Sequence, residues 1–206
     1  MKKPIIKYTK LDTFENCYIN QNFIEKEIKE NAKKTLELTD IEFNSCILKN
    51  INFSNIKLKR VDIIDCIFKN CDLSNQVFDF KLLDRVVFES CKLIGTSFIN
   101  SSLKDIEIFA SNLEYSNFSG TRITDLKAAD SNFSSSTFNE CEFKKVSFND
   151  NNFTKVEILN TKLKGIDFST CNIEGIMIDK DSMVGMIISP IDSKEFVRML
   201  GVIVKD

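Results

Sequence analysis

The side chains best suited to chemistry are seven cysteines and thirty acidic residues, in a chain without histidine. A cysteine or serine nucleophile usually needs a histidine base, and protein zinc sites usually combine histidines with cysteines or use Cys-x-x-Cys pairs. Neither arrangement occurs in this sequence. We therefore predict no metal, no cofactor and no enzymatic activity.

The cysteines follow a spacing of their own. Each of six lies two residues before a large apolar residue: Cys46, Cys66, Cys71, Cys91, Cys141 and Cys171. An inward column of thiols in a cytosolic protein usually serves packing, although Cys46 and Cys66 should lie close enough for a disulfide. No apolar run approaches the roughly 18 residues of a membrane span, and the start lacks a secretory segment. We expect the protein to be cytoplasmic.

The elements that position these residues repeat every five residues. From Phe43 to Ile178 every fifth residue is Phe, Leu or Ile, except Ala128. A period of five fits neither an α-helix nor a straight strand, so each unit must contain a corner. Residues two apart on an extended segment share a face, so a small residue and a large one point inward together. The second corner position is often Gly or Asn, which tolerate a positive φ.

The inward positions should form a packed interior. Ala128 follows Leu126, so a small and a large residue have exchanged places, as a close-packed core would require. Lys81 falls at an inward position, and we expect a local bulge to turn it outward. One column of the core should consist of phenylalanines from successive coils: Phe78, Phe98, Phe118 and Phe138.

Units such as Cys71-Asp72-Leu73-Ser74-Asn75 resemble those of the pentapeptide-repeat family. The resemblance implies an all-β fold, a right-handed quadrilateral β-helix with four units in each coil. With coils stacked at ~4.8 Å, the rod should be roughly 30 Å long. We predict an N-terminal partial coil and helix cap over residues 1–37, the β-helix over 38–188, and a C-terminal capping and dimerisation segment over 189–206.

The N-terminal segment suggests a partial coil in another frame, with Phe14, Ile19 and Ile24 inward. The charged run over residues 25–34 favours a short helix before the coil resumes at Leu36. A solvated linker is the alternative. The helix would cover an outward apolar pair, Ile47 and Ile67.

At the C-terminus, Asp192 could cap a helix that ends at Gly201, followed by a strand over residues 202–204. The apolar side chains here exceed what one cap needs. We therefore predict a two-fold homodimer joined end to end through the apolar C-terminal residues. These are Phe196, Met199, Leu200, Val202 and Val204.

The tail carries a second resemblance. Met183-Val184-Gly185, Ser189-Pro190 and Met199-Leu200-Gly201-Val202-Ile203-Val204 resemble the corresponding segments of Qnr-type quinolone-resistance proteins of Gram-positive bacteria. This implies binding to a type II topoisomerase, DNA gyrase or topoisomerase IV, and its protection from quinolones by DNA mimicry. It implies no direct contact with nucleic acid. A generic β-helix interaction scaffold with another partner is the alternative.

Charge limits the mimicry. Residues 38–188 contain 21 acidic and 17 basic residues, a net charge of −4, whereas duplex DNA of similar length carries roughly 20 negative charges. Only a local acidic strip could imitate DNA, and an ordinary surface of mixed charge is the alternative. Its candidate residues are Asp65, Asp105, Glu107, Asp125, Asp130 and Asp150.

Two further sets of side chains should point outward. Phe80, Phe109 and Tyr115 are candidates for contact with a partner. Asparagines should form a ladder of side-chain hydrogen bonds between coils, which needs no partner to explain it. They are Asn112, Asn132, Asn152 and Asn172.

Overall fold

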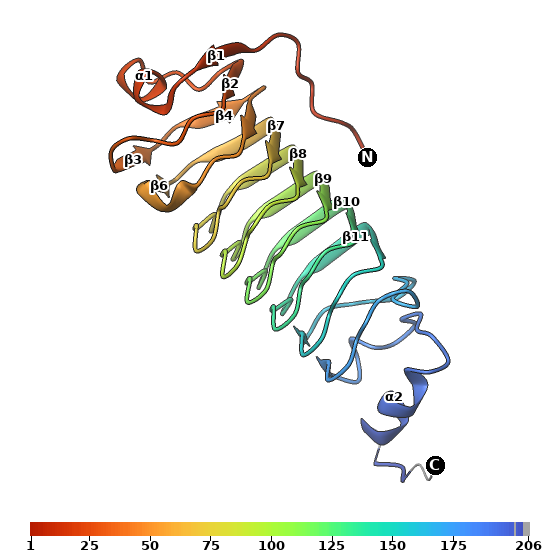
Figure 1. Ribbon diagram of the computed structural model, residues 1–206. Helices are drawn as coiled ribbons and strands as arrows, with labels where there is room; N and C mark the ends of the chain where they lie inside the picture. The colour runs from red at the N-terminus through yellow and green to blue at the C-terminus, as the bar shows by residue number, and fades with distance from the viewer. Residues whose placement is uncertain (200, 204–206) are drawn as a thin grey trace.

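The computed structural model describes residues 1–199 and 201–203. It is a parallel-strand solenoid of about eight turns that forms an elongated rod (Figure 1). From β2 onward each paired residue lies opposite the residue twenty positions further on, as Leu83 pairs with Leu103. Four five-residue units therefore make one turn, and the predicted quadrilateral β-helix is confirmed.

Most strands lie in one nine-stranded parallel sheet, in the order β1-β2-β5-β7-β8-β9-β10-β11, with β4 beside β7. Its members are β1 (Lys10–Asp12), β2 (Lys26–Ile28), β4 (Glu42–Asn44), β5 (Ile47–Lys49), β7 (Asp62–Lys69), β8 (Leu82–Glu89), β9 (Ser102–Phe109), β10 (Arg122–Ala129) and β11 (Glu142–Asn149). Two smaller sheets pair β3 (Leu36–Thr39) with β6 (Ile56–Lys59), and β12 (Glu157–Ile158) with β13 (Met177–Ile178). The helical elements in the described residues are α1 (Phe14–Ile19), the 3-10 turn η1 (Phe53–Asn55) and α2 (Ser193–Met199).

The interior consists of the residues that recur every five positions. Phe78, Phe98, Phe118 and Phe138 are at most 3% exposed. Their rings stack in one column, with successive centroids 5.4, 4.9 and 4.6 Å apart and interplanar angles of 17°, 8° and 2°. The predicted phenylalanine column is confirmed. Leu126 and Ala128 are both buried, as the exchange of their volumes requires.

The corners adopt the left-handed backbone conformation that the sequence predicts. Asn75, Phe80 and Gly120 have φ values of 60°, 60° and 68°. A Cβ atom added at Gly120 would lie 2.1 Å from Oδ1 of Asn100 in the preceding turn. Glycine at this corner therefore allows two successive turns to approach closely.

The seven cysteines are buried and carry free thiols. Burial raises the pKa of Cys17 and of Cys141 to about 12, so both thiols stay protonated at neutral pH. The Sγ atom of Cys141 lies 3.0 Å from the backbone oxygen of Phe118 in the turn before it. The cysteines serve packing between turns, as expected.

The N-terminal prediction was wrong in its helix position and its frame. Helix α1 begins after Thr13, whose side chain accepts a hydrogen bond from the N–H of Asn16, and the charged run contains strand β2 instead of a helix. Ile19 and Ile24 are 75% and 52% exposed, whereas Phe23 and Ile28 are buried. These two continue the five-residue series backward from Phe43. Pairing of β2 with β1 and β5 overrides the helix propensity of the charged residues.

The C-terminal helix is present, and Phe196 packs against the core. The predicted strand after it is absent at Val202 and Ile203. Leu200 and Val204 lie outside the described residues. No helix in the described part of the chain combines the length and the apolar character that crossing a membrane requires.

The last turns are joined by the Asp179 carboxylate. It accepts hydrogen bonds from the backbone N–H groups of Asn160, Asp181 and Ser182 and from the Ser182 hydroxyl, at 2.6 to 3.0 Å. The bonds from Ser182 are the main reason that the pKa of Asp179 falls from 3.8 to about 2. The folded pKa lies below the unfolded one, so this stabilisation is present above about pH 4 and is lost as pH falls toward about 2.

We expect Asp179→Asn to flatten this part of the acid dependence and to lower the free energy of unfolding at neutral pH by about 1 kcal/mol. Denaturant unfolding at several pH values measures both effects. Asp181→Asn, an exposed neighbour, is the matched control and should change neither. An unchanged acid dependence in Asp179→Asn contradicts this role.

Candidate protein-binding surfaces

One corner of the solenoid carries a carboxylate in three of four successive strands, and we call it the acidic corner. Asp65 lies in β7, Asp105 in β9 and Asp125 in β10, with Arg85 of β8 between the first two. The strands align these residues because each is twenty positions from the next. Glu107 lies on the side that follows this corner.

Residues 1–9, the N-terminal arm, run along this edge of the rod (Figure 1). The backbone N–H of Ile5 donates to Oδ1 of Asp65 at 2.8 Å, and that of Lys2 donates to Oδ1 of Asp105 at 2.5 Å. Three ionic contacts also hold the arm on the acidic corner and on Glu107 beside it. They join the Met1 ammonium to Asp105 at 3.9 Å and to Asp125 at 3.7 Å, and Lys3 Nζ to Glu107.

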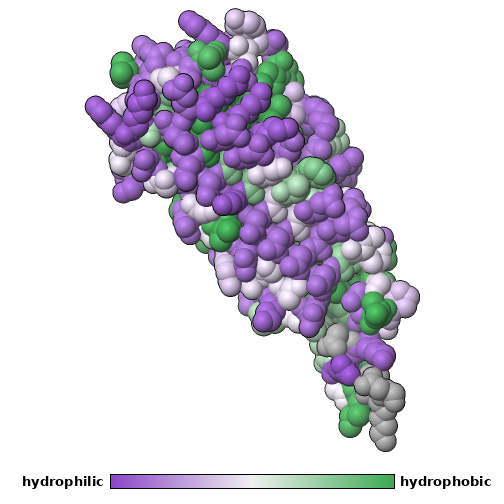
Figure 2. Space-filling view, in the orientation of Figure 1, coloured by the Kyte–Doolittle hydropathy of each residue, from purple (hydrophilic) through white to green (hydrophobic). Residues whose placement is uncertain are grey.

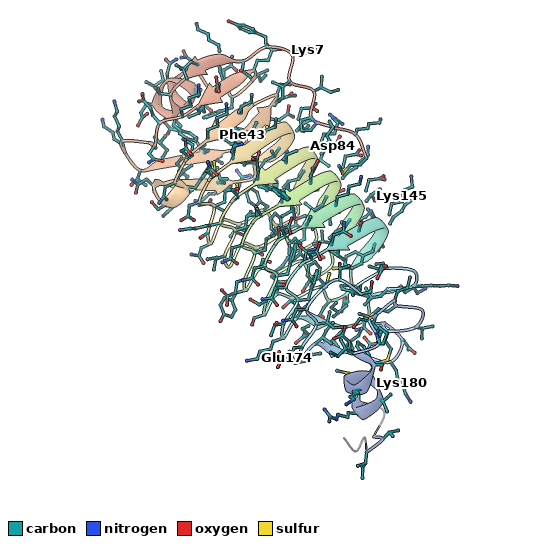
Figure 3. The ribbon with its side chains drawn as sticks, turned by 45° about the vertical axis from the view of Figure 1, so that its right-hand side comes forward. Lys7, Phe43, Asp84, Lys145, Glu174 and Lys180 are labelled. Atoms are coloured by element: carbon teal, nitrogen blue, oxygen red, sulfur yellow. The ribbon has the colours of Figure 1, made fainter. Side chains whose placement is uncertain are left out.

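The carboxylates of the acidic corner are therefore already partnered. Arg85 donates two hydrogen bonds to Asp65, at 2.6 and 2.8 Å. The Arg85 guanidinium is the main cause that lowers the pKa of Asp65, and the Ile5 N–H adds to it. Asp65 and Asp105 are 6% and 5% exposed. Figure 3 shows Lys7, Asp84 and Lys145 following one another along this edge, and Lys145 lies 3.9 Å from Asp125.

The arm, and not a helix, lies along this part of the molecule. We predicted that a helix over residues 25–34 would cover Ile47 and Ile67, and that prediction was wrong because this stretch contains no helix. Helix α1 contacts β3 instead. Ile47 and Ile67 are half-buried. The arm's contacts with the acidic corner were missed from the sequence.

The other candidate residues lie apart from the arm. Asp130 and Asp150 are exposed on the next corner. Phe80, Phe109 and Tyr115 point outward, with 72%, 45% and 62% of their surface exposed, and they lie on different corners and sides. On the face that Figure 2 shows, apolar residues form separate spots along the rod. The outward aromatic residues do not form one continuous patch.

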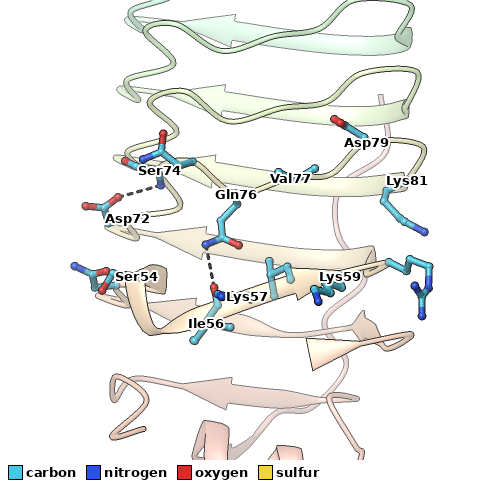
Figure 4. A pocket seen from close by; sticks show the side chains of 14 residues that line it. Ser54, Ile56, Lys57, Lys59, Asp72, Ser74, Gln76, Val77, Asp79 and Lys81 are labelled. Carbon is cyan, nitrogen blue, oxygen red and sulfur yellow. Dashed lines mark hydrogen bonds between the residues drawn. The ribbon is translucent and has the colours of Figure 1, made fainter. Parts of the chain in front are cut away.

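A groove of about 760 Å³ lies between β6 and the turn that follows it along the rod. Among the strands of the described residues, β6 pairs with β3 alone, whereas Val77 pairs with Ser97 of the following turn. The backbone of β6 is therefore not paired with the segment around Val77. Instead, the side-chain Nε2 of Gln76 donates a hydrogen bond to the carbonyl oxygen of Ile56 at 3.0 Å (Figure 4).

The cause of this opening lies in the sequence. Gln76 and Lys81 occupy inward positions that elsewhere hold mostly Cys, Val, Ile, Ser or Thr, and both side chains are too long and polar to enter the core. Lys81 is half-buried and lines the groove, so its side chain turns outward as expected. The predicted bulge is absent, because the backbone N–H of Lys81 donates to the carbonyl oxygen of Phe78 as that of Ser101 donates to Phe98 one turn further on. Two other cations beside the groove are paired, Lys59 with Glu37 and Arg60 with Asp40.

The asparagine ladder connects successive turns. Asn132 donates to Asn112 at 3.1 Å, and Asn152 donates to Asn132 at 3.0 Å. The Oδ1 atoms of Asn112, Asn132 and Asn152 each also accept a hydrogen bond, at 3.0 Å, from the backbone N–H two residues further along the chain. The ladder stabilises the coil as predicted over Asn112, Asn132 and Asn152, but among the described residues no side-chain hydrogen bond continues it to Asn172. Within residues 1–199 and 201–203, no cluster of three or more His, Cys, Asp or Glu side chains could hold a metal ion.

Comparison with known proteins agrees with this architecture. The sequence-family model "Pentapeptide repeats (8 copies)" matches residues 37–75 and 131–169. The sequence-family model "Pentapeptide repeat region" matches residues 61–132. The chain belongs to the pentapeptide-repeat family. No curated protein matches this pentapeptide-repeat chain in sequence.

Several solved pentapeptide-repeat structures are similar in fold. Full-length QnrB1, a plasmid-mediated fluoroquinolone resistance protein, is 18% identical, with 88% of this chain and 93% of that chain covered and a TM-score of 0.48. A trypsin-treated variant of QnrB1 is 20% identical, with coverage of 89% and 92% and a TM-score of 0.45. HetL from the cyanobacterium Nostoc sp. strain PCC 7120, involved in heterocyst differentiation regulation, is 12% identical, with coverage of 85% and 95% and a TM-score of 0.32.

Proposed function

We propose that this protein binds a type II topoisomerase, DNA gyrase or topoisomerase IV, without catalysing a reaction, and lessens its inhibition by quinolones. The observation that carries the proposal is the C-terminal end of the rod. Helix α2 packs Phe196 on the core, yet Met199, Val202 and Ile203 remain 43%, 52% and 87% exposed. Exposed apolar residues at this position fit the end-to-end homodimer predicted from the apolar C-terminal residues, and they lie in the tail whose sequence resembles Qnr-type proteins.

The acidic corner is the proposed contact for a basic surface of the topoisomerase. Its carboxylates lie on regular strands of a rigid solenoid, so their spacing is fixed before binding. A net charge of −4 over residues 38–188 is too small to imitate the charge of duplex DNA along the whole rod. The mimicry we propose is therefore local and centres on Asp105, Glu107 and Asp125.

A supercoiling assay tests this function. We expect the purified protein, at low micromolar concentration, to restore DNA supercoiling by gyrase in the presence of a quinolone. Asp105→Asn with Asp125→Asn should raise the concentration needed by about tenfold, because two attractive charges at the contact are lost.

The matched control is Glu114→Gln with Glu174→Gln, which removes the same charge from the opposite corner of the solenoid and should protect as the unmodified protein does. Absence of protection at tens of micromolar rejects the proposed function. A dominant cellular partner unrelated to DNA topology would favour the scaffold alternative.

A further inference from the structure

We infer that the acidic corner is a docking surface for an extended basic peptide segment, and that the N-terminal arm occupies this surface in the unbound protein. The arm is then a built-in competitor that a partner must displace. This inference deepens the proposed function, on which it rests for the statement that the basic segment belongs to a topoisomerase.

The spacing of the acceptors matches an extended chain. Asp65 and Asp105 are two turns apart, about 10 Å at the spacing of neighbouring strands. Their donors, the N–H groups of Ile5 and Lys2, are three residues apart, also about 10 Å along an extended chain. A peptide that runs along the rod therefore presents a donor to each of these carboxylates. In the turn between them, Arg85 is held by Asp65 and Asp84.

The chemistry of the corner selects the occupant. Ionised carboxylates only accept hydrogen bonds, so the occupant must supply backbone N–H groups and ammonium groups. The arm supplies both, with three lysines in Met1-Lys2-Lys3-Pro4-Ile5-Ile6-Lys7. Pro4 has no N–H to donate and favours an extended conformation at the residue before it. An acidic segment or a nucleic acid would be repelled.

The arm is held in a way that permits displacement. None of residues 1–9 is fully buried, and the core begins at Phe14. Ile5 and Tyr8 are 52% and 71% exposed, so the arm gains little from apolar burial. Asp125 and Glu107 remain partly open to solvent, so the contacts of Met1 with Asp125 and of Lys3 with Glu107 each change an equilibrium constant by at most about fivefold and weaken with salt. An arm that is bound to the acidic corner, which we call closed, should therefore reduce the affinity for a partner by about tenfold.

A peptide supplied in trans tests the surface without a topoisomerase. The probe is a fluorescent peptide with the sequence of residues 1–8, titrated by anisotropy against a chain that starts at Thr9. This truncation removes no buried side chain. We expect saturable binding that weakens about tenfold in the full chain, where the arm competes.

Substitutions then locate the binding site. In the truncated chain, Asp105→Asn with Asp125→Asn should weaken peptide binding at least about tenfold. Glu114→Gln with Glu174→Gln, which removes the same charge from the opposite corner, should leave it unchanged. Equal binding to all variants, or no binding to any, overturns the inference.

A second pair of variants keeps the full chain. Lys3→Glu places a carboxylate beside Glu107 and should release the arm, so that the labelled peptide binds almost as well as it binds the truncated chain. Lys7→Glu makes the same change in charge elsewhere in the arm and should leave the arm closed. Similar peptide binding by the two variants contradicts a closed arm.

The same proteins separate this inference from the proposed function. If the peptide binds the acidic corner but neither chain protects gyrase, the docking surface stands and the topoisomerase proposal fails. If both chains protect gyrase equally and the peptide does not bind, the topoisomerase proposal stands and this inference fails. If both hold, the truncated chain should protect at about tenfold lower concentration.

Discussion

Phe98→Ala is expected to lower the free energy of unfolding by about 3–5 kcal/mol, because it leaves a cavity in the centre of the rod. Phe98 is 3% exposed, and its ring stacks on Phe78 at 5.4 Å and on Phe118 at 4.9 Å. Both neighbours belong to turns that are held in register by the backbone ladder. The surroundings therefore have little freedom to collapse into the space, which places the effect in the upper part of the usual range.

Denaturant unfolding of the variant and the unmodified protein measures the loss. Phe80→Ala is the matched control, because Phe80 is 72% exposed at a corner and its removal should change stability by less than about 0.5 kcal/mol. A loss below about 1 kcal/mol for Phe98→Ala would show that this column does not bear the packing of the interior.

The solenoid could be predicted because the same five-residue signal recurs in every turn. One displaced residue, Ala128, did not obscure it, since Leu126 compensates its volume within the same unit. The breaks in the ladder also left a signal. Gln76 and Lys81 at inward positions mark the opening beside β6, although the sequence alone pointed only to a bulge at Lys81.

The N-terminal region could not be predicted in the same way because its structure depends on distant partners. Lys26–Ile28 becomes a strand only because β1 and β5 lie on either side of it. The local charge pattern favours a helix in isolation, and pairing within the sheet reverses that preference. Phe23 and Ile28 in the frame of the main series were the available evidence, which the apparent frame of Phe14, Ile19 and Ile24 concealed.

The candidate site was predicted in part. The period of twenty residues places Asp65, Asp105 and Asp125 on one corner, and the structure does so. The repeat period could not indicate that the N-terminal arm, 60 or more residues away in sequence, lies on these carboxylates. The available signal was the complementarity of charge between the lysines of the arm and the row of carboxylates.

The C-terminal end should account for self-association. Met199 is the last residue of α2 and is 43% exposed, and Phe196 of the same helix packs against the core, which fixes the position of the Met199 side chain. In an isologous dimer each substitution occurs twice in one interface, and a carboxylate buried there without a partner is strongly unfavourable. We expect Met199→Asp to raise the dimer dissociation constant at least about a hundredfold, equivalent to about 2.7 kcal/mol.

Sedimentation equilibrium measures this effect directly against the chain mass of 23.6 kDa. Met177→Asp is the matched control, because Met177 is similarly exposed, at 51%, but lies on β13 within the solenoid. It should leave the dimer intact, which separates loss of a specific interface from a general effect of added charge. A monomeric mass for the unmodified protein well above micromolar concentration contradicts the dimer. In that case the exposed Met199, Val202 and Ile203 would require a different partner, because an apolar end of this kind is unfavourable in water.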